Sequence, residues 1–164
     1  MLETCDDLAT LGFDGFVTIQ ELTEKPWLPP VAQGVYSVLA PEGFSKCFTE
    51  KGTGGPFKGK NPNLPVSNLE QNWVSGSKLL YIGKAGLGKS GNRGLRKRLG
   101  EYMRFGQGKK IGHKGGRLIW QLREHSRLLV CWRITRTDPG IVESEMLLQF
   151  KNLFGALPFA KLRH

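Results

Sequence analysis

The chain of 164 residues has too few cysteines for the structures that cysteine usually builds. Cys5, Cys47 and Cys131 are odd in number, far apart and without a Cys-x-x-Cys pair, which argues against a disulfide scaffold and a zinc ribbon. The sequence also lacks any apolar run of about 18 residues, so no membrane-spanning helix is expected. Its acidic N-terminus shows no signal peptide, and a reducing cytoplasm is the expected compartment.

Acidic residues are scarce in the second half of the chain. Residues 81–136 carry fifteen Lys and Arg against only Glu101 and Glu124, whereas residues 1–30 carry six acids and one Lys. The formal net charge of the whole chain is +10. So basic a block favours a polyanionic partner, and the charge pattern therefore predicts binding to a nucleic acid.

The length fits one domain, and the sequence contains no internal repeat. Residues 1–30 are interpreted as a lead-in segment that ends in a proline-rich stretch, and residues 31–164 as the domain itself. Within that domain, residues 41–78 form an insertion rich in Gly, Pro, Asn and Lys. A loop of this length is usually either functional or disordered.

Apolar stretches at 34–40, 79–83 and 128–135 predict three strands. Since few crossover helices connect them, they predict an α+β fold, a sandwich in which a small, largely antiparallel three-stranded sheet is flanked by helices. Helices are predicted at 95–105, where Leu95, Leu99 and Met103 share one face, and in a short form at 117–124.

A last helix is predicted to begin at Asp138-Pro139 and to run to about Phe154. Asp can accept hydrogen bonds from the first free N–H groups of a helix, and Pro suits the first helical turn. Gly155 and then Pro158 follow, a combination that ends helices.

The turn after the second predicted strand matches the phosphate-binding P-loop pattern. Gly83, Gly88, Lys89 and Ser90 fit G-x-x-x-x-G-K-[ST]. A P-loop helix begins at the Lys-Ser pair so that its N–H groups face the phosphate, but here two glycines follow Ser90 within four residues and disfavour a helix. The P-loop domain also needs a parallel sheet. A P-loop nucleotide-binding protein is therefore kept as the less favoured alternative.

Four short motifs resemble those of the GIY-YIG nucleases. GVY at 34–36 and YIG at 81–83 resemble the two half-motifs that name the family. LRKRL at 95–99 resembles the family's Arg-bearing helix, and ESEMLL at 143–148 resembles the later helix with a metal-binding Glu. GALPFA at 155–160 is similar to the tail of restriction-endonuclease-like members. The resemblance implies a DNA endonuclease that hydrolyses phosphodiester bonds with Mg²⁺ or Mn²⁺.

The same resemblance implies a role for each catalytic position. It makes Tyr36 a general base or a residue that orients water, and Tyr81 its hydrogen-bonding support. Arg98 would hold the scissile phosphate with its planar guanidinium. Tyr102 lies four residues after Arg98, where similar nucleases carry a Tyr or a His, and is a second candidate on the same helix face. A tyrosine base needs a nearby cation to lower its pKa, which Lys84 could supply.

The implied metal ligand is Glu145. Helical spacing puts Ile141 and Leu148 beside it, which predicts that its carboxylate faces the protein body, where a metal ion would satisfy it. Glu143 is a rival that periodicity does not exclude, and only the resemblance prefers Glu145. The family's supporting Asn, often in a PFAN sequence, is replaced here by Lys161. A catalytically weakened DNA-binding relative is therefore the second alternative.

Further basic residues are expected to contact DNA, duplex rather than single strand. They lie in the insertion, on the first long helix and in the loop after it: Lys58, Lys60, Arg96, Lys97, His113, Lys114 and Arg117. A solvated run of charges or an ordinary loop His would look the same in the sequence. A symmetric double-strand cutter would need a dimer, so a homodimer is also left open.

Overall fold

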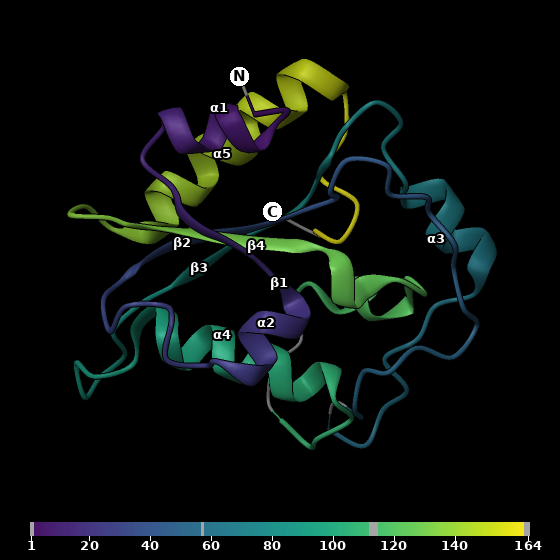
Figure 1. The fold of residues 1–164 in the computed structure, drawn as a ribbon, viewed down its shortest axis with the longest axis horizontal. Helices are drawn as coiled ribbons and strands as arrows, with labels where there is room; N and C mark the ends of the chain where they lie inside the picture. The colour runs from purple at the N-terminus through teal and green to yellow at the C-terminus, as the bar shows by residue number, and fades with distance from the viewer. Residues whose placement is uncertain (1, 57, 112–114, 163–164) are drawn as a thin grey trace.

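The computed structural model describes residues 2–56, 58–111 and 115–162. In these parts of the chain, four strands form one open antiparallel sheet, and helices cover both of its faces (Figure 1). The structure therefore confirms the α+β class and the antiparallel sheet. It also adds a strand to the three that the sequence predicts.

The sheet has the strand order β1-β4-β2-β3, in which β2 pairs with both β3 and β4. The strands are β1 (Asp14–Thr18), β2 (Gly34–Leu39), β3 (Leu79–Ala85) and β4 (Leu129–Ile134). The additional strand β1 comes from the expected lead-in and pairs with β4. It is short and bulged between Gly15 and Val17, so its sequence lacks the regular alternation that identifies a strand.

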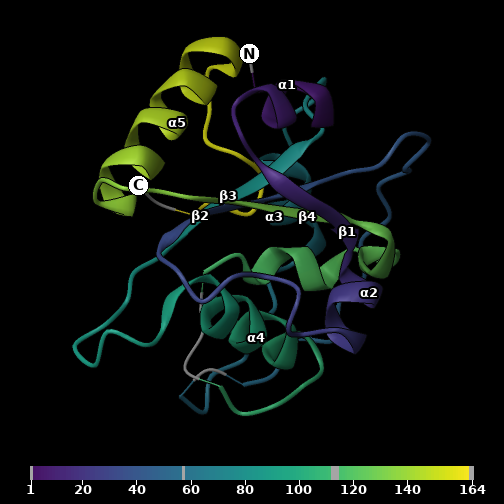
Figure 2. The same ribbon diagram turned by 60° about the vertical axis from the view of Figure 1, so that its left-hand side comes forward.

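Helices form two layers around the sheet. They are α1 (Cys5–Thr10), α2 (Ile19–Glu24), α3 (Val66–Asn72), α4 (Gly94–Gly106) and α5 (Pro139–Phe154), with 3-10 helices at Arg117–Gln121 and His125–Arg127. Figures 1 and 2 show α1 and α5 on one face of the sheet and α2 and α4 on the other. Of the helices in the described residues, none is long and apolar enough to cross a bilayer.

Helix α5 has the ends that its sequence predicts. The Asp138 carboxylate accepts a hydrogen bond from the Gly140 N–H at 2.8 Å, and Pro139 occupies the first turn. Gly155 ends the helix in the left-handed conformation, with φ of 74°, which glycine adopts without steric cost. Both ends of α5 are therefore set by contacts within a few residues.

The described part of the insertion 41–78 packs onto the α4 side of the molecule. The buried Gln121 amide accepts a hydrogen bond from the Leu64 N–H at 2.9 Å and donates to the Leu64 carbonyl at 2.8 Å. It also donates to the Thr49 carbonyl at 3.2 Å. The Gly55 N–H donates to the Phe105 carbonyl of α4 at 2.8 Å. The described part of the insertion is therefore packed against the rest of the domain, and the expectation of a disordered loop does not apply to it.

The turn 86–93 does not have the geometry of a P-loop. Helix α4 begins at Gly94, four residues after Ser90, and not at the Lys89-Ser90 pair. Both of these side chains are exposed. Since the sheet is antiparallel as well, the helix N-terminus that would bind a nucleotide phosphate is not presented by this motif.

Candidate active site

All three tyrosines of the chain lie together between the sheet and α4. The ring centroids of Tyr36 and Tyr81 are 5.9 Å apart, those of Tyr81 and Tyr102 are 5.9 Å apart, and those of Tyr36 and Tyr102 are 6.2 Å apart. The rings come from β2, β3 and α4 and are all buried. Three residues that the sequence singles out separately therefore form one cluster, here called the tyrosine cluster.

Gly83 makes room for the cluster. It lies opposite Tyr36 in the β2–β3 register, and a Cβ atom added to it would lie 2.5 Å from Cζ of Tyr36 and 2.7 Å from its hydroxyl. No larger residue fits unless the ring moves. The glycine of the YIG sequence is thus required by the tyrosine of the neighbouring strand.

Arg98 lies at the rim of the tyrosine cluster, half-buried. A Cβ atom on Gly115 would lie 2.5 Å from the Tyr81 hydroxyl and 3.7 Å from Nη2 of Arg98, so both groups border the same backbone segment. The Tyr102 hydroxyl donates a hydrogen bond to the Gly116 carbonyl at 2.8 Å. Because its proton is used in this way, Tyr102 is suited to holding residues 115–116 against the cluster.

Burial dominates the ionisation of the tyrosines. It raises the pKa of Tyr36 above the ordinary value of 10.0, although the charge of Arg98 and hydrogen bonding to Arg98 and Tyr81 oppose the rise. It also raises the pKa values of Tyr81 and Tyr102 well above 10.0. Tyr36 is therefore a neutral phenol near pH 7. The Tyr36 hydroxyl is buried, and no described residue meets it at regular hydrogen-bond geometry. Buried polar groups usually have a partner, so this hydroxyl is a candidate contact for a ligand.

Helix α5 brings Glu143, and not Glu145, to the tyrosine cluster. Glu143 is buried, and its charge contributes to the raised pKa values of Tyr36 and Tyr81. Glu145 is exposed on the outer face of α5, together with Ile141 at 56 % and Leu148 at 59 % exposure. The expectation that Glu145 faces the protein body is therefore wrong.

The error arises because α5 carries apolar residues on two faces. The face that packs on the sheet presents Val142, Met146, Leu147 and Phe150. This set has the i, i+4, i+8 spacing of a buried stripe and includes the position of Glu143 at its border. The stripe is visible in the sequence and would have selected Glu143, whereas Ile141 and Leu148 on the outer face pointed to Glu145.

Lys161 contacts the Glu143 carboxylate directly. Its Nζ lies 3.0 Å from Oε2 of Glu143, and the two side chains are 14 % and 9 % exposed. The same Nζ lies 5.5 Å from the centroid of the Tyr81 ring. The residue at the position of the family's Asn therefore places a fixed positive charge beside the carboxylate.

Lys84 lies apart from the tyrosine hydroxyls. It follows Gly83 on β3 and is exposed, so its side chain projects to the opposite face of the strand. Its Nζ lies 3.2 Å from where a Cβ atom on Gly140 would stand, which places it at the start of α5. The expectation that Lys84 lowers the pKa of a tyrosine is wrong, because Arg98 is the cation beside Tyr36.

Comparison of the chain with protein-family models, with curated proteins and with solved structures finds no match. The function is therefore inferred from the geometry of the cluster.

The cluster offers a divalent metal ion a single protein carboxylate, that of Glu143, one oxygen of which contacts Lys161. Among the described residues, no group of three or more His, Cys, Asp or Glu side chains could hold a metal. Mg²⁺ often takes only one or two carboxylates and completes its coordination with water and substrate phosphate oxygens. Glu143 is suited to this arrangement, and the unpartnered Tyr36 hydroxyl offers a further oxygen nearby. Glu145, the ligand that the resemblance implies, lies on the other face of α5.

The residues expected to contact DNA come from three segments of the chain. Arg96 and Lys97 are exposed on α4, Lys58 and Lys60 are exposed in the insertion, and Arg117 is half-buried. His113 and Lys114 lie outside the described residues. Arg96 and Lys97 lie on the same helix as Arg98.

Proposed function

We propose that the chain is a GIY-YIG-type endonuclease that hydrolyses phosphodiester bonds in DNA with one Mg²⁺ or Mn²⁺ ion. The observation that carries the proposal is the convergence of Tyr36, Tyr81, Arg98 and Glu143 from four separate elements on one cluster. These side chains are separated by up to 107 positions in the sequence, and they combine an anion-binding group, two phenols and a carboxylate.

Arg98 is placed to bind the scissile phosphate. A guanidinium presents several N–H donors in one plane and matches two phosphate oxygens at once. Beside a buried cluster its charge is less screened than in water, so it stabilises the negative charge that develops in the transition state. Arg98 is half-buried at the rim, so it can reach a phosphate while its position is set by α4.

Tyr36 is placed to orient the attacking water. Because its raised pKa keeps the hydroxyl protonated near pH 7, it offers a hydrogen bond and does not act as a ready base. Tyr81 lies beside it on the adjacent strand, with ring centroids 5.9 Å apart, and helps to lower the pKa of Tyr36. The general-base role that the resemblance allows for Tyr36 is therefore not the one we propose.

Glu143 would hold the divalent cation. When bound, such an ion supplies positive charge to the phosphate and lowers the pKa of water. Lys161 already contacts one of the two carboxylate oxygens, so it competes for the charge of Glu143. This contact specifically supports the second candidate function, a DNA-binding relative with weakened cleavage.

Glu143→Gln, compared with Glu145→Gln, tests the proposed nuclease. We expect Glu143→Gln to reduce Mg²⁺- or Mn²⁺-dependent plasmid nicking by about 10²-fold or more, because the amide carries no charge to hold the ion. DNA binding should be retained or slightly tightened, since the carboxylate repels phosphate. Glu145→Gln, two residues away on the exposed face, should cut like the wild type.

Two results would reject the nuclease: wild-type cleavage that is equal in chelator, or normal cleavage by both Gln variants. Loss of cleavage in Glu145→Gln alone would restore Glu145 as the metal ligand. DNA binding measured in chelator with the same variants shows whether substrate is still recognised.

Lys161→Asn distinguishes the nuclease from the weakened relative. Removing the ammonium frees the Glu143 carboxylate and restores an uncharged side chain that can accept a hydrogen bond. If Lys161 limits cleavage, the rate should rise several-fold and half-maximal activity should require less Mg²⁺. Lys151→Asn, an exposed change on α5, is the matched control. Unchanged rate and Mg²⁺ dependence would show that Lys161 does not restrict the site.

A further inference from the structure

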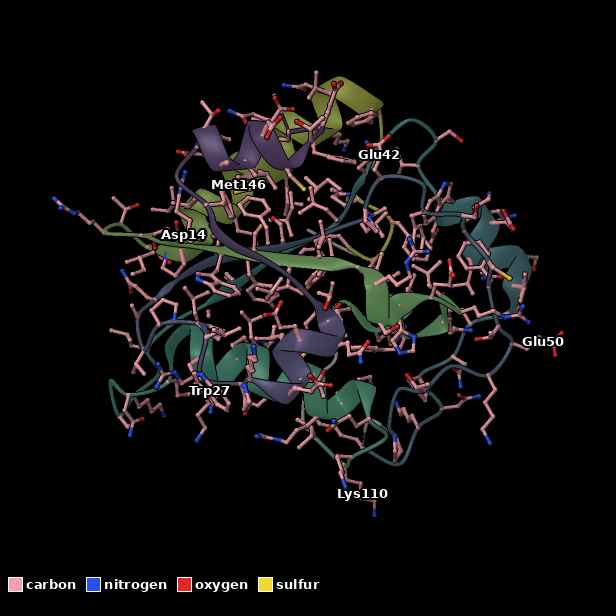
Figure 3. The ribbon with its side chains drawn as sticks, viewed as in Figure 1. Asp14, Trp27, Glu42, Glu50, Lys110 and Met146 are labelled. Atoms are coloured by element: carbon pink, nitrogen blue, oxygen red, sulfur yellow. The ribbon has the colours of Figure 1, made fainter. Side chains whose placement is uncertain are left out.

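A groove lies along α4, outside the tyrosine cluster. It has a volume of about 450 Å³ and runs between α4 and the segment that follows α2. Its lining combines an exposed aromatic ring with basic side chains: Trp27, Arg93, Arg96, Lys97 and Arg104. Figure 3 shows Trp27 on the α4 side of the sheet, whereas Met146 of α5 lies on the other side.

The basic residues of this groove, here called the Trp27 groove, lie along one side of α4 and at its N-terminal end. Arg96 and Lys97 follow Arg93, the residue before α4, by 3 and 4 positions, and Arg104 follows Lys97 by 7, spacings that place side chains in a stripe along one side of a helix. Gly100 lies on the same stripe, where even an added Cβ would have only the Arg104 side chain within 4 Å, at 3.9 Å. At Gly100 the helix therefore leaves space between the basic side chains of the groove.

Part of this charge is held in place and part is free to bind. Arg96 donates from Nε to the Pro29 carbonyl at 2.9 Å, which fixes its guanidinium beside the Trp27 segment. Arg93 pairs with Glu101 at 2.6 Å. Lys97 and Arg104 form no ion pair with any described residue. The groove thus has unneutralised cations, which favours an anionic occupant.

Trp27 offers the groove a flat aromatic face. Of the four tryptophans, all within the described residues, Trp120 and Trp132 are buried, Trp73 is half-buried, and Trp27 is 59 % exposed. Pro26, Pro29 and Pro30 surround it, and prolines restrict the backbone on which the ring is mounted. An exposed ring held next to cations combines the two contacts that single-stranded nucleic acids need, stacking for a base and charge for a phosphate.

We infer that the Trp27 groove binds an unpaired nucleotide of the DNA substrate, with its base on the Trp27 ring and its phosphate at Lys97 and Arg104. The bases of an intact duplex are stacked on one another, so their faces are closed to an indole. The inference deepens the proposed function, on which it rests: it predicts a nuclease that prefers DNA with a single-stranded region, in contrast to the duplex that the sequence suggested.

The groove and Arg98 are close enough to share one DNA strand. Arg98 follows Lys97 by one residue, or about 100° around the helix, so it projects from α4 to one side of the stripe. A helix with its side chains is about 10–12 Å across, and one strand of B-DNA carries a phosphate per 3.4 Å of helix axis. A strand bound at Arg98 therefore reaches the Trp27 groove within a few nucleotides.

The test is a binding titration in chelator, so that no cleavage occurs. A labelled 12-nucleotide thymidine oligonucleotide and a blunt duplex of the same length, thymidine paired with adenosine, are titrated with the wild type and with Trp27→Leu. We expect Trp27→Leu to bind the single strand about tenfold more weakly, the effect of losing one stacked base, and to bind the duplex unchanged. The wild-type tryptophan fluorescence should be quenched by the single strand, and this quenching should disappear in the variant.

Leu148→Ala is the matched control, because Leu148 is equally exposed but lies on α5. It should bind both oligonucleotides like the wild type. Arg104→Ala should weaken both, since it removes charge without removing the ring. Far-UV circular dichroism and thermal unfolding check that each variant is folded.

Equal single-strand binding by the wild type and Trp27→Leu would overturn the inference, and so would equal loss for single strand and duplex. Absence of tryptophan quenching by the single strand would also overturn the inference and would favour a protein partner for the exposed ring. The proposed nuclease fails separately: Trp27-dependent binding without Glu143-dependent cleavage keeps the groove and rejects the enzyme. Glu143-dependent cleavage without an effect of Trp27→Leu on binding keeps the enzyme and rejects the groove.

Discussion

At the scale of single residues, the arrangement of the tyrosine cluster depends on three glycines, which have no side chain to collide with the tyrosines. The ring of Tyr36 covers Gly83, and the hydroxyls of Tyr81 and Tyr102 approach Gly115 and Gly116. Each glycine thus fixes the place of one phenol. The tyrosines can approach the backbone this closely only because glycine has no Cβ atom.

Arg98→Ala, compared with Lys89→Ala, separates the tyrosine cluster from the P-loop motif. If Arg98 stabilises transition-state charge, its loss should lower cleavage by about 10²-fold or more. Lys89 is exposed in a turn that precedes α4, so Lys89→Ala should leave cleavage largely intact. The assay is plasmid nicking with Mg²⁺, with ATP hydrolysis measured in parallel. Hydrolysis of ATP that depends on Lys89 would contradict the nuclease and support the P-loop alternative.

The sequence singled out Tyr36, Tyr81, Tyr102 and Arg98, but for the carboxylate the resemblance preferred Glu145 and left Glu143 as a rival. The first four could be found because short motifs and helical spacing mark them locally. Which face of α5 packs on the sheet depends on contacts with β2 and β3, which are far away in the sequence. The inner apolar stripe of α5 is longer than the outer pair Ile141 and Leu148, so helical spacing favours Glu143, whereas the resemblance favours Glu145.

At the scale of secondary-structure elements, one buried amide joins two segments of the insertion to the rest of the domain. Gln121 ends the 3-10 helix Arg117–Gln121 and contacts segments of the insertion about 14 positions apart, at Thr49–Glu50 and at Leu64. No charged group of the insertion is needed for this attachment. The insertion and the 3-10 helix therefore form one packed unit next to α4.

Gln121→Ala should detach this unit. The substitution leaves the Leu64 N–H and the carbonyls of Leu64 and Thr49 without their partner, and each buried unsatisfied group costs about 1–3 kcal/mol. We expect a clear fall in the melting temperature and faster proteolysis within residues 41–78. Gln107→Ala, an exposed change after α4, is the control. A melting temperature equal to that of the wild type would show that the amide does not hold the insertion.

Helix ends and strand positions were predictable where the chemistry is local. The cap at Asp138, the proline of the first turn and the glycine that ends α5 all act within a few residues. Strand β1 was missed, since a bulged five-residue edge strand has little alternation of its own. Its identity as a strand comes from pairing with β4, more than a hundred positions later.

At the scale of the whole molecule, burial of every tyrosine links stability to alkaline pH. Each of the three has a pKa above 10.0 in the folded protein, while the unfolded chain has the ordinary value. Below pH 10 both states are protonated and stability is complete. As the pH rises above 10 the unfolded chain loses protons first, so the free energy of unfolding falls until the folded pKa values are reached.

We therefore expect the melting temperature to fall steeply above pH 10. Each tyrosine contributes up to about 1.4 kcal/mol per pH unit. Tyrosinate absorbance at 295 nm should rise together with unfolding, because the chain has no tyrosine outside the cluster. Tyr36→Phe should make the decline about a third shallower. Absorbance that titrates near pH 10 while the protein stays folded would show that the phenols are open to solvent.

The inner position of β4 determines when the sheet can be completed during folding. Residues 129–134 form the last strand in the chain, yet they lie between β1 and β2 and pair with both. During synthesis, β1 and one edge of β2 must therefore wait for these late residues before their hydrogen bonds can form. Pairing over such sequence distances slows folding, and a nascent chain with two unpaired strand edges is open to association with other chains. Prompt insertion of β4 thus governs the yield of folded protein as well as the shape of the sheet.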